Sequence, residues 1–200
     1  MAGVLRGGAA YTFPVILLRL LALGLVTGQM PATETPALAN ATVLIVRHAE
    51  KPPEGDGLTS AGEARARAYV QYFKKYRLTH IFAASDSKKS RRPRLTVEPL
   101  AASLRQKVDV RFPDSDPAAL VKELGAQRYG GRILISWRHG KIPGLIEAFG
   151  ADPKKLLPAG RWPDDVFDEV IELRYDRKGQ LLPEKAKLIH ENLMPGDSHP

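Results

Sequence analysis

The chain has 200 residues, of which 44% are hydrophobic, so it can form a domain-sized core, and global disorder is excluded. It contains no cysteine, which excludes a disulfide scaffold, a cysteine-ligated zinc site and thiol catalysis. Its 30 Lys and Arg residues against 22 Asp and Glu residues give a formal charge of +8. This excess indicates an anionic partner, which by charge alone could be nucleic acid, a membrane or a phosphorylated small molecule.

The first 39 residues differ in composition from the rest of the chain. A short basic start precedes an apolar stretch at 13–26, which only Arg19 interrupts, and small residues follow at 37–39. This layout is typical of a secretory signal peptide, with an uncleaved membrane anchor or a plain extension as alternatives. We therefore expect a signal peptide or anchor at 1–39 and a folded domain at 40–200. The expected location is secreted or periplasmic, with membrane contact only if the segment stays uncleaved.

From residue 42 onwards, strand-like and helix-like segments alternate. In chain order they are a strand at 42–46, a helix from 60 to about 76, a strand at 80–84, a helix from 93 to about 104, a strand at 108–112, a helix at 117–124, a strand at 132–136 and a helix at about 143–149, followed by two antiparallel strands at 167–175 and 180–188. This alternation predicts an α/β fold, a three-layer sandwich with a mostly parallel central sheet flanked by helices and with C-terminal antiparallel strands. Thr59 or Ser60 can cap the first helix, and Ser60 with Glu63 has the spacing of a capping box.

Polar residues follow three of the expected strands, at the end of the strand where ligands bind in open α/β sheets. They lie at 47–51, at 85–94 and at 137–140. Two histidines, His48 and His139, and several arginines would therefore converge above one sheet edge. Arginine presents a fork of donors to phosphate oxygens, and neutral imidazole is a competent nucleophile near pH 7. The pattern therefore favours phosphoryl chemistry.

Four motifs stand in order along this part of the chain. They are Arg47-His48-Ala49 after the first strand, Leu58-Thr59-x-x-Gly62 at the first helix, Ser85-Asp86 with Arg92-x-x-x-Thr96, and His139-Gly140 after an apolar strand. In this order they resemble the histidine phosphatase superfamily, which contains phosphoglycerate mutases and histidine acid phosphatases. The resemblance runs from about residue 42 to residue 175. The string RHAEKP at 47–52 is similar to a group of small, often exported bacterial members.

The resemblance implies a metal-independent phosphatase that needs no cofactor and acts on a small phosphorylated anion. His48 would attack phosphorus and carry a transient phosphohistidine. Arg47, Arg92 and His139 would surround the phosphoryl oxygens and stabilise the charge of the transition state. Water would then release phosphate. The further residues expected to contact the substrate are Ser85, Lys89, Arg91 and Gly140.

The spacing around the phosphate-binding arginine departs from the family pattern. Arg92 lies seven positions after Ser85, where the family has a spacing of four. Lys89 or Arg91 could therefore take the role of Arg92. We favour Arg92 because its spacing to Thr96 fits the family motif.

The proton donor is a second departure. Gly140 follows the second histidine, where acid phosphatases of the family have an aspartate. Asp114 or Asp116, in a proline-bounded loop, could protonate the leaving oxygen instead. Aspartates in such loops are more often turn formers or helix caps, which is the competing interpretation.

Three other functions compete with a phosphatase. The departures are compatible with a catalytically weak or silent phosphate-binding module of the same fold. A phosphomutase would need a lid that excludes water, for which the chain is short. The basic run at 88–94 resembles a nucleic-acid patch, but it lacks interleaved aromatic residues. We expect this run to steer an anionic substrate, and no nucleic-acid partner.

Overall fold

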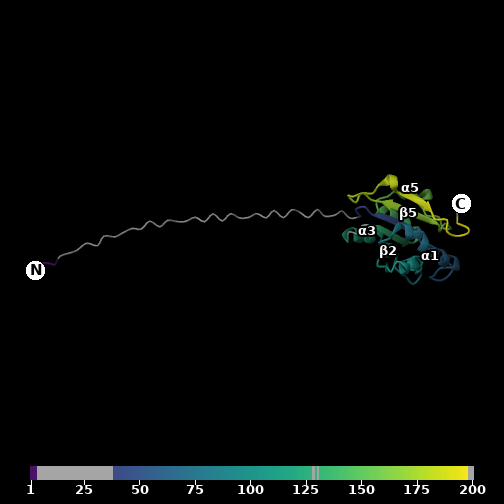
Figure 1. Cartoon of the computed structure of the whole chain (residues 1–200), viewed down its shortest axis with the longest axis horizontal. Coiled ribbons are helices and arrows are strands. Elements are labelled where there is room, and N and C mark those ends of the chain that lie inside the picture. Colours follow the sequence, from purple (N-terminus) through teal and green to yellow (C-terminus); the bar gives the residue numbers. More distant parts are fainter. Residues whose placement is uncertain (4–37, 128, 130, 198–200) are drawn as a thin grey trace. The chain divides into compact units, whose positions relative to one another are not determined.

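The computed structural model describes residues 1–3, 38–127, 129 and 131–197 (Figure 1). The chain divides between residues 33 and 34, and the fold described below belongs to the second unit, 34–200. The expected signal peptide or anchor at 1–39 lies almost wholly outside the described residues, so it stays a prediction. In the described part of the chain, no helix is both long enough and apolar enough to cross a membrane.

Six strands in the described part of the chain form one sheet, in the order β3-β2-β4-β1-β5-β6. Their bounds are Thr42–Arg47 (β1), His80–Ala83 (β2), Val108–Asp109 (β3), Arg132–Trp137 (β4), Glu169–Arg174 (β5) and Lys187–His190 (β6). The first four strands run parallel to one another, whereas β5 is antiparallel to both β1 and β6. This confirms the predicted mixed sheet with its C-terminal antiparallel strands.

Helices cover both faces of the sheet. Their bounds are Ser60–Tyr72 (α1), Arg92–Ser103 (α2), Pro117–Ala126 (α3), Ile142–Ala148 (α4) and Pro153–Leu156 (α5). Alternate residues of a strand point to opposite faces, and β1 divides its side chains in this way. Val43 and Ile45 pack with residues of α3, α4 and α5, whereas Leu44 and Val46 pack with residues of α1 and α2. The three-layer α/β architecture is therefore confirmed.

The end of the chain and the start of α1 differ from the sequence predictions. The expected strand at 180–188 is replaced by a 3₁₀ turn at Pro183–Lys185, and β6 begins only at Lys187. A single antiparallel bridge already joins Tyr175 to Leu181, but Pro183 has no N–H to give to a sheet, so the continuous strand starts beyond it. The N-cap of α1 is Thr59, whose Oγ1 accepts from the Gly62 N–H. The capping box predicted from Ser60 and Glu63 is therefore wrong.

Candidate active site

The two central parallel strands bring the two candidate histidines to the same sheet edge. β1 and β4 pair in register, with Arg47 opposite Trp137, so the residues after both strands emerge together. The N–H of His48 donates to the carbonyl oxygen of Trp137 at 2.9 Å. The ring centroids of His48 and His139 lie 6.2 Å apart in an edge-to-face arrangement.

The two ring nitrogens of His48 have different environments. Nδ1 lies 2.8 Å from the carbonyl oxygen of Ala49, which can only accept, so Nδ1 carries the proton and Nε2 keeps its lone pair. The residue is only 3% exposed. Burial lowers the pKa of His48 to about 3; the bond to Ala49 opposes this shift, and the charges of Arg47 and Arg92 add to it. His48 is therefore neutral at pH 7, as a nucleophile must be.

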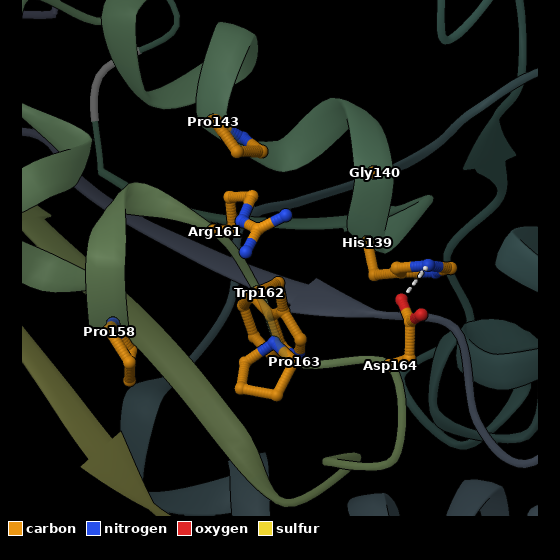
Figure 2. A pocket seen from close by; sticks show the side chains of 8 residues that line it. All are labelled: His139, Gly140, Pro143, Pro158, Arg161, Trp162, Pro163 and Asp164. Atoms are coloured by element: carbon orange, nitrogen blue, oxygen red, sulfur yellow. Dashed lines mark ion pairs between the residues drawn. The ribbon is translucent and has the colours of Figure 1, made fainter.

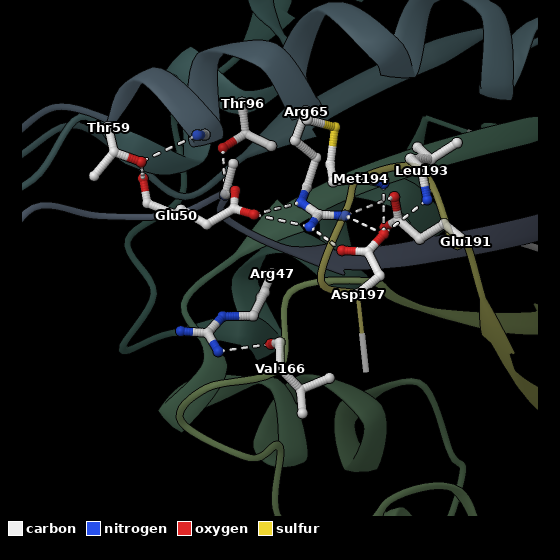
Figure 3. Close-up of polar contacts among 12 residues, drawn as sticks. Arg47, Glu50, Thr59, Arg65, Thr96, Val166, Glu191, Leu193, Met194 and Asp197 are labelled. Carbon is white, nitrogen blue, oxygen red and sulfur yellow. Dashed lines mark hydrogen bonds and ion pairs between the residues drawn. The ribbon is translucent and has the colours of Figure 1, made fainter. Parts of the chain in front are cut away.

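Arg47 is fully buried and held by a loop more than 100 residues further along the chain. Its Nη1 donates to the carbonyl oxygens of Pro163, Asp164 and Val166, at 3.0, 2.9 and 2.7 Å (Figure 3 shows the bond to Val166). The Phe167 ring lies 3.8 Å from the guanidinium carbon. Burial lowers the pKa of Arg47 to about 10, so the side chain stays cationic at neutral pH. Its buried Nε has no partner among the described residues, and an N–H there is available to an anion.

His139 lies between Arg47 and a carboxylate that the sequence did not single out. Arg47 Nη2 lies 3.4 Å from His139 Nδ1. On the other side of the ring, Asp164 Oδ1 lies 3.0 Å from His139 Nε2 (Figure 2). A guanidinium can only donate, so Nδ1 is the acceptor and Nε2–H donates to Asp164. Burial and then the charge of Arg47 lower the pKa of His139, whereas Asp164 opposes the shift. No spacing or motif in the sequence connects Asp164 with this histidine.

Arg92 begins α2 and contributes a second cation to the site. Its Nε donates to the carbonyl oxygen of Gly57 at 3.0 Å and its Nη2 bonds to that of Gly55, so it also fixes the preceding loop. Burial and the charge of Arg138 lower the pKa of Arg92. Arg138 itself pairs with Asp114 at 3.1 Å, between Nη1 and Oδ2. The structure therefore adds Arg138 to the cations beside Arg92 and places Asp114 next to them.

The hydrogen bonds of Thr96 give a structural reason for the Arg92-x-x-x-Thr96 motif. The Ala49 N–H donates to Thr96 Oγ1 at 2.8 Å, and this hydroxyl donates to the carbonyl oxygen of Arg92 at 2.8 Å. Thr96 is completely buried, so both bonds are shielded from water. The hydroxyl therefore links the backbone next to His48 to the first turn of α2.

Gly62 explains the motif at the start of α1. The Thr59 N–H donates to the Glu50 carbonyl oxygen at 3.0 Å. A Cβ on Gly62 would lie 2.5 Å from that same oxygen, so α1 can approach this closely only with glycine here. The motif thus fixes the backbone two residues beyond His48.

A buried ionic cluster continues behind Glu50 (Figure 3). Arg65 donates to Glu50 Oε1 from Nε and Nη2 at 3.0 and 2.8 Å, and also bonds to Asp197. Asp197 Oδ2 in turn accepts two backbone N–H groups of the C-terminal segment. Glu191 Oε2 lies 3.7 Å from Arg65 Nη1, and Glu191 Oε1 accepts from the Tyr69 hydroxyl at 2.8 Å. This cluster connects the loop that follows His48 to residues near the end of the chain.

The remaining predicted residues lie at varied places. Ser85 follows β2, where its N–H donates to the carbonyl oxygen of Phe112, and Gly140 lies in the turn after His139. Arg91 pairs with Asp56 on the surface, and Lys89 is exposed on the same segment. Asp116 caps α3 through a bond from the Ala119 N–H. Among the described residues, no cluster of three or more His, Asp or Glu side chains could hold a metal ion.

A cavity of about 380 Å³ lies directly beside His139 (Figure 2). Its walls come from the turn after β4 and from the loop that also holds Arg47. The lining residues are His139, Gly140, Pro143, Pro158, Arg161, Trp162, Pro163 and Asp164. The Trp162 Nε1 donates to the carbonyl oxygen of Val166 at 2.9 Å. The cavity therefore has a proline-rich wall and lies beside His139, which contacts Arg47.

No family model and no curated protein matches the sequence, whereas solved structures match the fold. A protein assigned as the α-ribazole-5′-phosphate phosphatase of Escherichia coli is 12% identical, with a TM-score of 0.52 over 76% of this chain and 96% of that one. A protein assigned as the phosphohistidine phosphatase SixA of Agrobacterium tumefaciens is 19% identical, with a TM-score of 0.50 over 74% of this chain and 97% of that one. Mycobacterial hydrolase 1 is 14% identical, with a TM-score of 0.50 over 74% of this chain and 100% of that one. The narrower likeness to the RHAEKP group stays a prediction. The chain has the fold of the histidine phosphatase superfamily.

Proposed function

We propose that this protein is a phosphatase that hydrolyses small phosphomonoesters through a phosphohistidine intermediate on His48. The observation that carries the proposal is the tautomer of that residue. The bond from Nδ1 to the Ala49 carbonyl leaves the Nε2 lone pair free, and burial keeps the ring neutral. Arg47 and Arg92 place positive charge beside His48, which suits the negatively charged oxygens of a phosphoryl group, and His139 lies next to both His48 and Arg47.

The reaction has two steps. In the first, Nε2 of His48 forms a bond to phosphorus, the bond to the leaving oxygen breaks, and that oxygen takes a proton from a carboxyl group. In the second, water attacks phosphorus, the N–P bond breaks, and the carboxylate recovers a proton from the water. The cationic side chains neutralise the negative charge that Mg²⁺ neutralises in other phosphoryl-transfer sites, so we propose a metal-independent reaction without a cofactor.

The proton donor is one of two carboxylates beside the site. Asp114 pairs with Arg138, whose charge acts on Arg92, and Asp164 contacts His139. Asp116, which the sequence offered equally with Asp114, is engaged as the cap of α3. We therefore prefer Asp114 over Asp116 for this role. The secreted or periplasmic location expected from the N-terminal segment would give the enzyme access to phosphomonoesters outside the cytoplasm.

The test is release of inorganic phosphate from a panel of phosphomonoesters by the purified chain and by His48→Ala. We expect the variant to lose at least ~10³-fold in kcat/KM. His80→Ala is the matched control and should retain full activity. His80 is the first residue of β2, at the end of the strand away from the candidate site. The unsubstituted chain should also take up an acid-labile, alkali-stable phosphate label that His48→Ala lacks.

Three results would contradict the proposal in different ways. If His48→Ala hydrolyses the esters as fast as the parent, His48 is not the nucleophile. If the parent binds inorganic phosphate but turns over no ester of the panel, the chain is the phosphate-binding module. If phosphate appears on a second substrate molecule rather than in solution, the chain is a phosphomutase.

A further inference from the structure

The cavity beside His139 is placed to receive the part of the substrate that leaves. His139 and Asp164 belong both to the cavity wall and to the proposed phosphoryl site. A leaving group that lies in the cavity can therefore be bonded to a phosphorus atom at the adjacent site. A volume of about 380 Å³ lies at the small end of ligand pockets, which hold about 300–1,000 Å³. This inference rests on the proposed function and concerns the substrate class.

Arg161 gives the cavity its chemical character. Its side chain is exposed, lies on the cavity wall, and extends between Pro143 and Trp162 on the side of His139 (Figure 2). Within the described part of the chain, its guanidinium makes no hydrogen bond or ion pair. The other arginines of the site already use donors in hydrogen bonds within the protein. Arg47 donates to the carbonyl oxygen of Pro163, and Arg92 donates to that of Gly57. Arg161 thus keeps its five donors for a ligand.

The negative charge on the cavity wall does not neutralise Arg161. The wall's carboxylate, Asp164, accepts a hydrogen bond from His139 Nε2. Its charge is also the largest that opposes the effect of burial on the pKa of Arg47. Asp164 is therefore engaged with the phosphoryl side of the site, and Arg161 is left as the free charge on the leaving-group side.

We propose that the cavity selects phosphomonoesters whose leaving group carries a second anionic group, a carboxylate or a phosphate, which Arg161 binds. A planar guanidinium pairs with either oxyanion through two parallel N–H···O bonds. The proline-rich wall lets a short, compact chain lie between the two anions. Arg161 thereby determines specificity and takes no part in the transfer of the phosphoryl group.

The experiment compares three esters of the same length. They are 3-hydroxypropyl phosphate, 3-(phosphonooxy)propanoate and propane-1,3-diyl bisphosphate, so that the far end is neutral, carboxylate or phosphate. We expect the unsubstituted chain to prefer at least one anionic ester over the neutral one by about tenfold or more in kcat/KM. Arg161→Gln should remove this preference and leave kcat/KM for the neutral ester within about twofold. Arg177→Gln, an exposed arginine of a different cavity, is the control with the same loss of charge.

The outcomes separate the two claims. Equal kcat/KM for all three esters, or an equal loss on all three in Arg161→Gln, overturns this inference and leaves the phosphatase intact. A preference for the carboxylate alone or the phosphate alone identifies which anion the cavity accepts. If no ester is hydrolysed, the proposed function fails, and calorimetric binding decides the inference. The anionic esters should then bind more tightly than the neutral one, and Arg161→Gln should abolish the difference; equal binding overturns the inference.

Discussion

At the scale of single residues, burial decides the protonation of His48. A histidine in water is half protonated at pH 6.5, whereas burial and the neighbouring cations lower the pKa of His48 to about 3. The unfolded chain regains the ordinary value. Between these pH values the unfolded state binds a proton that the folded state does not, so the folded state loses stability as the pH falls below 6.5.

This difference predicts how stability depends on pH. Relative to His48→Asn, the unsubstituted chain should lose about 2 kcal/mol of unfolding free energy between pH 7 and pH 5. Urea denaturation of both proteins at pH 7, 6 and 5 measures the change. The comparison with the variant cancels the other titrating groups. Parallel curves for the two proteins would show that His48 titrates normally and is not desolvated in the folded state.

At the scale of elements, the position of α1 depends on the absence of one side chain. The helix packs its first turn against the backbone of Glu50, and a Cβ on Gly62 would lie 2.5 Å from the Glu50 oxygen. Because that oxygen is backbone, either the helix or the loop after β1 must move to admit a methyl group. The same loop holds His48, so a movement of the helix also moves His48.

Gly62→Ala should therefore cost about 1–3 kcal/mol of unfolding free energy and also lower kcat. The control is Gly144→Ala, because Gly144 also lies in a helix, α4, and a methyl group there would meet no neighbouring side chain or loop within 4 Å. The control should gain up to about 1 kcal/mol, since alanine favours the helix. Thermal unfolding and phosphate release on both variants test the two effects. An equal gain in both proteins would mean that α1 does not pack as closely as the structure has it.

At the scale of the whole molecule, the buried cluster around Arg65 joins distant parts of the chain. Three carboxylates, of Glu50, Glu191 and Asp197, surround one guanidinium. Burial raises the pKa of Glu191 to about 8, although Tyr69 and Arg65 oppose this shift. Glu191 is therefore protonated at neutral pH, and the cluster carries less negative charge than its composition suggests.

The raised pKa gives a pH dependence of opposite sign to that of His48. The folded state holds a proton on Glu191 that the unfolded state releases above about pH 4.5, so stability falls as the pH rises towards 8. Glu191→Gln should remove a loss on the order of 2–4 kcal/mol between pH 5 and pH 8.5. Glu184→Gln, on the exposed turn before β6, is the control and should behave like the parent. A parent whose stability changes no more than that of Glu191→Gln would contradict the buried, protonated state.

Local pattern was sufficient to predict the central strands, the α/β architecture and the edge at which His48 and His139 meet. Hydrophobic periodicity and the alternation of strands with helices act over short distances, so one sequence carries that information. The contacts of Asp164 with His139 and of Arg65 with Asp197 depend on packing, and the latter pair is 132 positions apart. The late start of β6 has a similar origin, because the turn at Pro183 interrupts an otherwise strand-like segment.

The carbonyl oxygen of Val166 accepts from both Arg47 Nη1 and Trp162 Nε1, at 2.7 and 2.9 Å. One donor belongs to the anion-binding centre and the other to the wall of the adjoining cavity. Remodelling that wall to admit a different ester thus also shifts the acceptor that orients Arg47. Under the proposed function, selectivity for the leaving group and the rate of turnover therefore cannot evolve independently, because both depend on this one carbonyl oxygen.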